Sequence, residues 1–204
     1  EKGFVEVAKS GLVQGEWASS AAALDYDHDG RLDLVVVNYL EFDPAKIAKK
    51  GAGDCTWKGH PVMCGPEGLT PTFDRLYRGR GDGTFEETTD RAHFRPEHAG
   101  FGLGVITLDY DDDGDTDLYV SNDSTPNFLW ENQGDGTFVE VGLRRGVSHD
   151  ANGREQASMG IAAGDLNGDG RPDLFVTNFS GENSDLYLST QAGFRERSSQ
   201  AQLG

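Results

Sequence analysis

An acidic ten-residue pattern that occurs three times constrains this chain more than any other feature of its sequence. Each copy has aspartate at its first, fifth and ninth positions and glycine at its sixth, and a β-branched or aromatic run follows. The copies occupy residues 25–34, 109–118 and 165–174. Repetition at fixed register indicates an array of similar supersecondary units.

A second motif, Gly-Asp-Gly-Thr-Phe, repeats at Gly81–Phe85 and Gly134–Phe138, with weaker copies of its end at Phe4–Val7 and Phe194–Arg197. Gly-Asp-Gly is a hairpin-turn signal, because glycine tolerates a positive φ. The acidic copies start 84 and 56 residues apart, so one unit is about 56 residues long.

The longer first spacing predicts a loop insertion over residues 41–72. It contains the only two cysteines, Cys55 and Cys64, which are not spaced as a C-x-x-C redox or zinc motif. One disulfide that closes this loop is the favoured interpretation, and it would imply an oxidising compartment. Two unpaired thiols are the alternative.

The runs within a unit have strand length and β-forming composition. In the second unit the expected strands are Gly104–Leu108, Leu118–Val120, Asn127–Trp130 and Thr137–Val141. Four strands per repeat predict an all-β chain built from β-propeller blades. Residues 1–204 hold three blades and an orphan strand near Phe4, with one or two helical turns at most, over Pro44–Lys50. Since propellers close with four to eight blades, we expect a partial ring that the same chain or another chain completes.

The acidic spacing suits a hard divalent cation. Oxygen ligands at positions 1, 3, 5 and 9 can converge on one centre, position 7 can offer its backbone carbonyl, and glycine at position 6 allows the bend. Ca²⁺ fits this oxygen set best, and the lack of recurring Cys or His argues against zinc and copper. The predicted metal residues are Asp25, Asp27, Asp29, Arg31 and Asp33; Asp109, Asp111, Asp113, Asp115 and Asp117; and Asp165, Asn167, Asp169, Arg171 and Asp173. Because Asn167 carries no charge, the third of the three sites should be the weakest.

Two other interpretations of these loops fit the sequence less well. An EF-hand needs glutamate at position 12 and a following helix, but that position holds Val36, Val120 and Val176 and β-forming residues follow. An Asp/Gly-rich turn without metal would explain one copy more easily than three copies in register.

Charge excludes some functions. The formal net charge is -17, from 35 acidic and 18 basic residues, which argues against a nucleic-acid partner. The sequence has no run of 18 apolar residues, so we expect no membrane-spanning segment. The acids are concentrated, because the three nine-residue stretches that begin the repeats hold 13 of the 35. Such local charge favours a bound cation.

The acidic loops and the Gly-Asp-Gly-Thr-Phe turns resemble FG-GAP/VCBS repeats, the calcium-binding blades also found in the integrin alpha-subunit propeller. The runs Gly59–Pro66 and Arg75–Arg78 are similar to the group related to cartilage acidic protein, the ASPIC/UnbV-type proteins. This resemblance implies a seven-bladed ring and calcium ligation by the side chains at positions 1, 3, 5 and 9 of each loop.

Two functional hypotheses follow. The first is a calcium-stabilised extracellular or periplasmic scaffold, or an accessory subunit of a larger assembly, that binds a protein partner. The second is the propeller portion of a secreted hydrolase or lyase whose catalytic residues lie elsewhere. The sequence has no nucleophile elbow, phosphate loop, haem-attachment or zinc signature, so we expect no catalytic residue in this chain.

Overall fold

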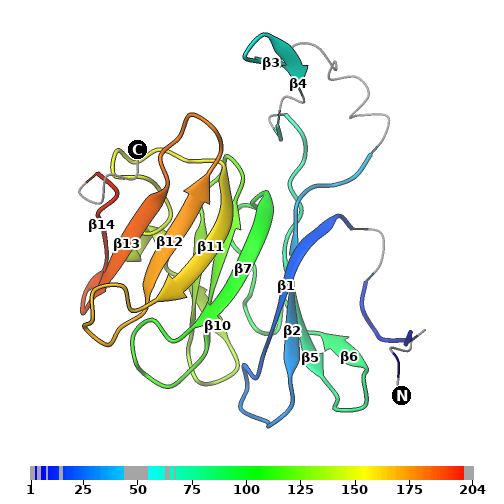
Figure 1. Ribbon diagram of the computed structural model, residues 1–204. Coiled ribbons are helices and arrows are strands. Elements are labelled where there is room, and N and C mark those ends of the chain that lie inside the picture. The colour runs from blue at the N-terminus through cyan, green and yellow to red at the C-terminus, as the bar shows by residue number, and fades with distance from the viewer. Residues whose placement is uncertain are drawn as a thin grey trace.

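The computed structural model describes residues 3, 6–7, 9–13, 16–43, 55–62, 65–66 and 68–199. Within these ranges the fold consists of three four-stranded antiparallel sheets and one two-stranded hairpin (Figure 1). The predicted all-β fold class with four-stranded blades is therefore confirmed. A closed ring of seven blades stays a prediction.

Each sheet follows the chain in simple up-and-down order. The first blade contains β1 (Ala18–Leu24), β2 (Asp33–Asn38), β5 (Arg75–Gly79) and β6 (Phe85–Glu87). The second contains β7 (Gly102–Leu108), β8 (Asp117–Asn122), β9 (Phe128–Asn132) and β10 (Phe138–Glu140). The third contains β11 (Ser158–Gly164), β12 (Asp173–Asn178), β13 (Asp185–Thr190) and β14 (Gly193–Glu196).

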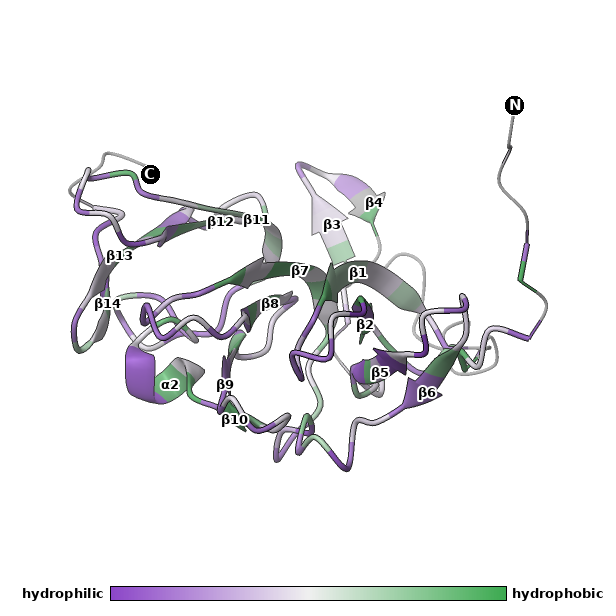
Figure 2. Ribbon diagram, turned by 90° about the horizontal axis from the view of Figure 1, so that it is seen from below, coloured by the Kyte–Doolittle hydropathy of each residue, from purple (hydrophilic) through white to green (hydrophobic). Residues whose placement is uncertain are grey.

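The first strands of the blades, β1, β7 and β11, lie next to one another, and the outer strands β6, β10 and β14 fan outward (Figure 2). Hydrophobic side chains fill the two junctions between neighbouring blades. Trp130, Phe94 and Val35 belong to the first junction core, and Tyr119, Leu129 and Tyr187 belong to the second. Burial between blades therefore aligns the three acidic loops side by side.

Antiparallel alternation sorts the connections to two ends of the blades. The acidic loops join first to second strands, and the Gly-Asp-Gly turns join third to fourth strands, so both kinds lie at one end, the lower edge of Figure 1. The insertion joins β2 to β5 at the opposite end. Its described part includes a hairpin of β3 (Cys55–Trp57) and β4 (His60–Val62).

Some sequence predictions fall outside the described residues. They are the helical turns expected over Pro44–Lys50, Phe4 of the orphan strand, and Cys64. The disulfide therefore stays a prediction, as do the boundaries of the 41–72 insertion. Ser10, further along the N-terminal segment, accepts a backbone hydrogen bond at 2.7 Å from Phe85 at the edge of β6.

One short helix was not predicted. Helix α2 (Gly142–Arg145) follows β10 and ends at Gly146, whose φ of 81° allows the left-handed C-cap. In the part of the chain that the structure describes, no helix is both long enough and apolar enough to cross a membrane.

Candidate metal centres: the three acidic loops

The first aspartate of each loop holds the loop backbone in a curl. Asp25 accepts N–H groups of Asp29 and Gly30 at 3.1 and 2.9 Å. Asp109 and Asp165 repeat the arrangement, each accepting three backbone N–H groups from the turn that follows. The repeated carboxylate at position 1 therefore shapes the loop even without a cation.

The ninth aspartate is buried and joins the loop to two places in its blade. Asp117 is 1% exposed and accepts N–H groups of Tyr110, at 3.1 Å, and of Asn132 on β9, at 2.8 Å. Asp33 and Asp173 make the same pair of bonds in the other blades. Burial raises the pKa of Asp117 to about 7, with these donors acting in the opposite direction. Each carboxylate oxygen has a second lone pair, so these bonds leave room for a metal contact.

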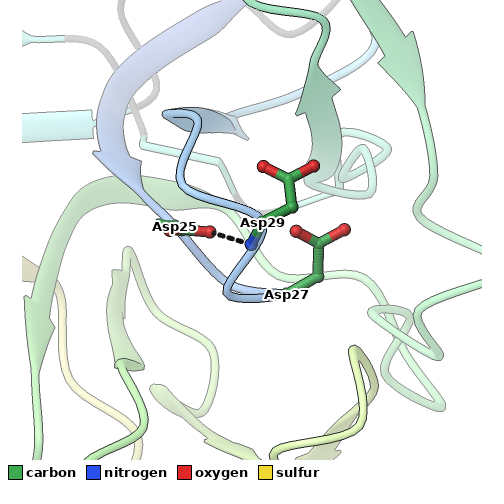
Figure 3. Close-up of side chains that lie close together, drawn as sticks. All are labelled: Asp25, Asp27 and Asp29. Atoms are coloured by element: carbon green, nitrogen blue, oxygen red, sulfur yellow. Dashed lines mark hydrogen bonds between the residues drawn. The ribbon is translucent and has the colours of Figure 1, made fainter.

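The loops differ in how closely their acidic oxygens converge. In loop 1 (residues 25–33), one oxygen from each of Asp25, Asp27 and Asp29 lies within 4.8 Å of the others (Figure 3). In loop 2 (residues 109–117) the trio is Asp109, Asp111 and Asp117, so the ninth residue of the loop joins in place of the fifth. Both trios consist of hard oxygen donors, which suit Ca²⁺.

One buried oxygen in loop 1 supports the fit to a cation. Oδ1 of Asp27 is buried and has no hydrogen-bond partner. Buried polar atoms are normally paired, so such an oxygen is a position that a bound cation would satisfy. In Figure 3 the carboxylates of Asp27 and Asp29 lie side by side above the loop.

Loop 3 (residues 165–173) forms no such acidic trio among the described residues. Its third position is Asn167, whose side-chain oxygen accepts the Asp169 N–H at 2.9 Å. The Nη2 group of Arg171 donates to Oδ2 of Asp169 at 2.7 Å. Coordination of a cation by the backbone carbonyls of the seventh residues, Arg31, Asp115 and Arg171, stays a prediction.

A position on the third strand of each blade also belongs to the site, and the repeat pattern did not reveal it. It precedes the residue whose N–H binds the ninth aspartate, and it holds Arg78, Glu131 and Leu188 in turn. Arg78 contacts Asp27 with Nε at 2.6 Å and Asp29 with Nη2 at 2.6 Å. The loops therefore have different electrostatic surroundings.

The pKa shifts follow this difference. In loop 1, burial alone would raise the pKa of Asp29, but the Arg31 N–H and the charges of Arg31 and Arg78 lower it. In loop 2, burial and then the charges of Asp113 and Glu131 raise the pKa of Asp111. Loop 1 thus has its own counterions, whereas loop 2 collects negative charge.

Loops 1 and 2 also contact each other. The fourth residue of loop 1, His28, adopts a φ of 55° and places Nε2 2.5 Å from Oδ1 of Asp115, the seventh residue of loop 2. This hydrogen bond raises the pKa of His28. Its stabilising contribution is complete below the ordinary histidine pKa of about 6.5, and it is lost as pH rises through the raised value.

We expect an NMR titration of the His28 ring to give a raised pKa in the folded chain. Asp115→Asn removes the charged acceptor and should return that pKa toward its ordinary value. An unchanged His28 pKa in Asp115→Asn would show that the two loops are not coupled through this contact.

Comparison with known proteins identifies the family of the repeats. The FG-GAP-like repeat model matches residues 69–120 and 109–176, which together cover more than half of the chain. The chain belongs to the FG-GAP-like repeat family.

Individual relatives carry the same name in three animals. Cartilage acidic protein 1 of Mus musculus is 38% identical over 77 residues, which is 38% of this chain and 11% of that protein. The Homo sapiens protein is 38% identical over 73 residues, and the Xenopus tropicalis protein is 34% identical over 80. These matches cover 36% and 39% of this chain and 10% and 12% of the relatives. The chain thus aligns with about a tenth of the length of these relatives.

Proposed function

We propose that this chain is a calcium-stabilised, extracytoplasmic scaffold that binds a protein partner or further blades, as an interaction module or accessory subunit. The proposal gives the chain a binding role and no catalytic role. The observation that carries it is the convergence of three carboxylate oxygens in each of loops 1 and 2.

The donor chemistry supports calcium. Ca²⁺ takes six to eight oxygen ligands and tolerates irregular geometry. The side chains at positions 1, 3, 5 and 9 would hold it, and the ion would supply the positive charge that offsets their mutual repulsion. Because the unfolded chain cannot assemble these oxygens, binding would favour the folded state.

The side of blade 3 that faces away from blade 2 supports a partner or a further blade. Tyr119 and Leu129 of blade 2 are 0% exposed in the core shared with blade 3. Their counterparts in blade 3, Phe175 and Leu186, are only half-buried. An apolar sheet face that a neighbour covers in one repeat therefore stands partly open in the next, and another β-sheet blade would fit it.

An extracytoplasmic location agrees with calcium chemistry. Weak oxygen-ligand sites, with dissociation constants of about 0.1–1 mM, are typical of extracellular modules. The predicted Cys55–Cys64 crosslink would also require an oxidising compartment. The relatives' name, cartilage acidic protein 1, is compatible with this location.

Thermal unfolding with and without calcium tests the proposal. At calcium a hundredfold above Kd, one site should stabilise the folded chain by about 2.7 kcal/mol, so the melting temperature should rise by several degrees relative to chelator. The double variant Asp111→Asn/Asp113→Asn should lose part of this response. Asp90→Asn, which changes an exposed acid outside the loops, should retain all of it. Equal melting temperatures in calcium and chelator, with no metal found by elemental analysis, would refute the proposal.

A further inference from the structure

The guanidinium of Arg78 occupies the carboxylates that a cation in loop 1 would need. Its Nε lies 2.6 Å from Oδ2 of Asp27, and its Nη2 lies 2.6 Å from Oδ2 of Asp29. These acids are the third and fifth residues of the loop. Arg31 also contacts Oδ2 of Asp29. Two guanidinium groups therefore share the anionic face of loop 1.

The equivalent position of blade 2 carries the opposite charge. Glu131 accepts hydrogen bonds from the Tyr110 hydroxyl and from Arg145 Nη2, the latter at 2.9 Å. Arg145, whose charge lowers the pKa of Asp111, is therefore held by Glu131. The seventh residue of loop 2 is Asp115, where loop 1 has Arg31. Among the described ion pairs of loop 2, none joins an arginine to an aspartate of the loop.

We propose that Arg78 is an internal competitor for calcium in loop 1, so that loop 1 binds the ion more weakly than loop 2. This inference rests on the proposed function and concerns how that function is distributed among the loops. A guanidinium and Ca²⁺ compete for the same oxygens, and calcium entry requires Arg78 to release Asp27 and Asp29. Loop 1 then fills only at calcium concentrations that already saturate loop 2.

Electrostatics sets the size of the effect. A unit charge about 5 Å from a divalent ion, in water-like surroundings, changes the binding constant roughly tenfold or more. Leucine is a suitable replacement because Leu188 occupies this position in blade 3 on the same kind of strand. Arg78→Leu therefore removes the competing charge and places at this strand position a residue type that blade 3 already has there.

A calcium titration followed by NMR resolves the loops separately. The amides of Gly30, Gly114 and Gly170, the sixth residues of the three loops, report on loops 1, 2 and 3. In the unmodified chain Gly114 should shift at lower calcium than Gly30. In Arg78→Leu the midpoint for Gly30 should fall by about tenfold or more, with that for Gly114 unchanged.

Arg95→Leu is the matched control. Arg95 pairs with Asp90 outside the loops, at 2.7 Å, so this variant loses the same charge and should move neither midpoint. Native dispersion of the remaining amides verifies that each variant is folded. If calcium shifts Gly30 at the same midpoint with and without Arg78, the competition is refuted and the calcium role stands. If no glycine responds to millimolar calcium in either protein, the calcium role and the inference both fail.

Discussion

Asp117→Ala is expected to lower the free energy of unfolding by about 4 kcal/mol, since two buried backbone donors each lose an acceptor at a cost of about 1–3 kcal/mol. The donors are the N–H groups of Tyr110 and Asn132. The Tyr110 donor lies in loop 2, and the Asn132 donor lies on β9. Urea denaturation in chelator measures the loss without any contribution from metal.

Two further variants make this measurement specific. Asp117→Asn keeps one acceptor oxygen but places its NH2 group toward the second donor. Its free energy of unfolding should therefore lie between those of the unmodified chain and Asp117→Ala. Glu97→Ala, at a side chain that is 91% exposed, should stay within about 0.5 kcal/mol of the starting stability. A loss below about 1 kcal/mol for Asp117→Ala would mean that water or a shifted loop replaces the carboxylate.

Trp130→Ala should cost about 3–5 kcal/mol, the range for deleting a buried tryptophan side chain. Trp130 is 1% exposed, and its ring centroid lies 4.5 Å from that of Phe94. Because its ring fills the junction between blades 1 and 2, the cavity would lie where the blades meet. Equilibrium unfolding measures the loss.

Trp130→Phe retains an aromatic ring in the junction and should lose much less stability than alanine. Val139→Ala shortens a side chain of the same sheet at a residue that is 43% exposed, and it should change the free energy of unfolding little. Similar losses for Trp130→Ala and Val139→Ala would contradict the role of the tryptophan in joining the blades.

Local repetition explains why the strands and the acidic loops could be predicted. A loop that curls on its own first aspartate is determined by residues within five positions of Asp109 or Asp165, and such spacing is visible in sequence. The β-forming runs of strand length that predict each strand are equally local. For these parts, prediction and structure agree.

Contacts between distant strands explain what the sequence could not reveal. Arg78 is 49 residues from Asp29, and Glu131 and Leu188 occupy its position with different chemistry, so no repeated residue type marked it. The bond from the Asn132 N–H to Asp117 likewise depends on how β8 pairs with β9. Helix α2 follows from the turn chemistry at Gly146, a feature that its blade does not share with the others.

The placement of the β3–β4 hairpin at the far end of the strands from the acidic loops has an electrostatic consequence. Strands of six residues separate the two ends by about 20 Å. Charges at that distance are largely screened at physiological ionic strength, where the Debye length is about 8 Å. Under the proposed calcium role, filling or emptying the loops should therefore leave the electrostatic potential around the hairpin nearly constant.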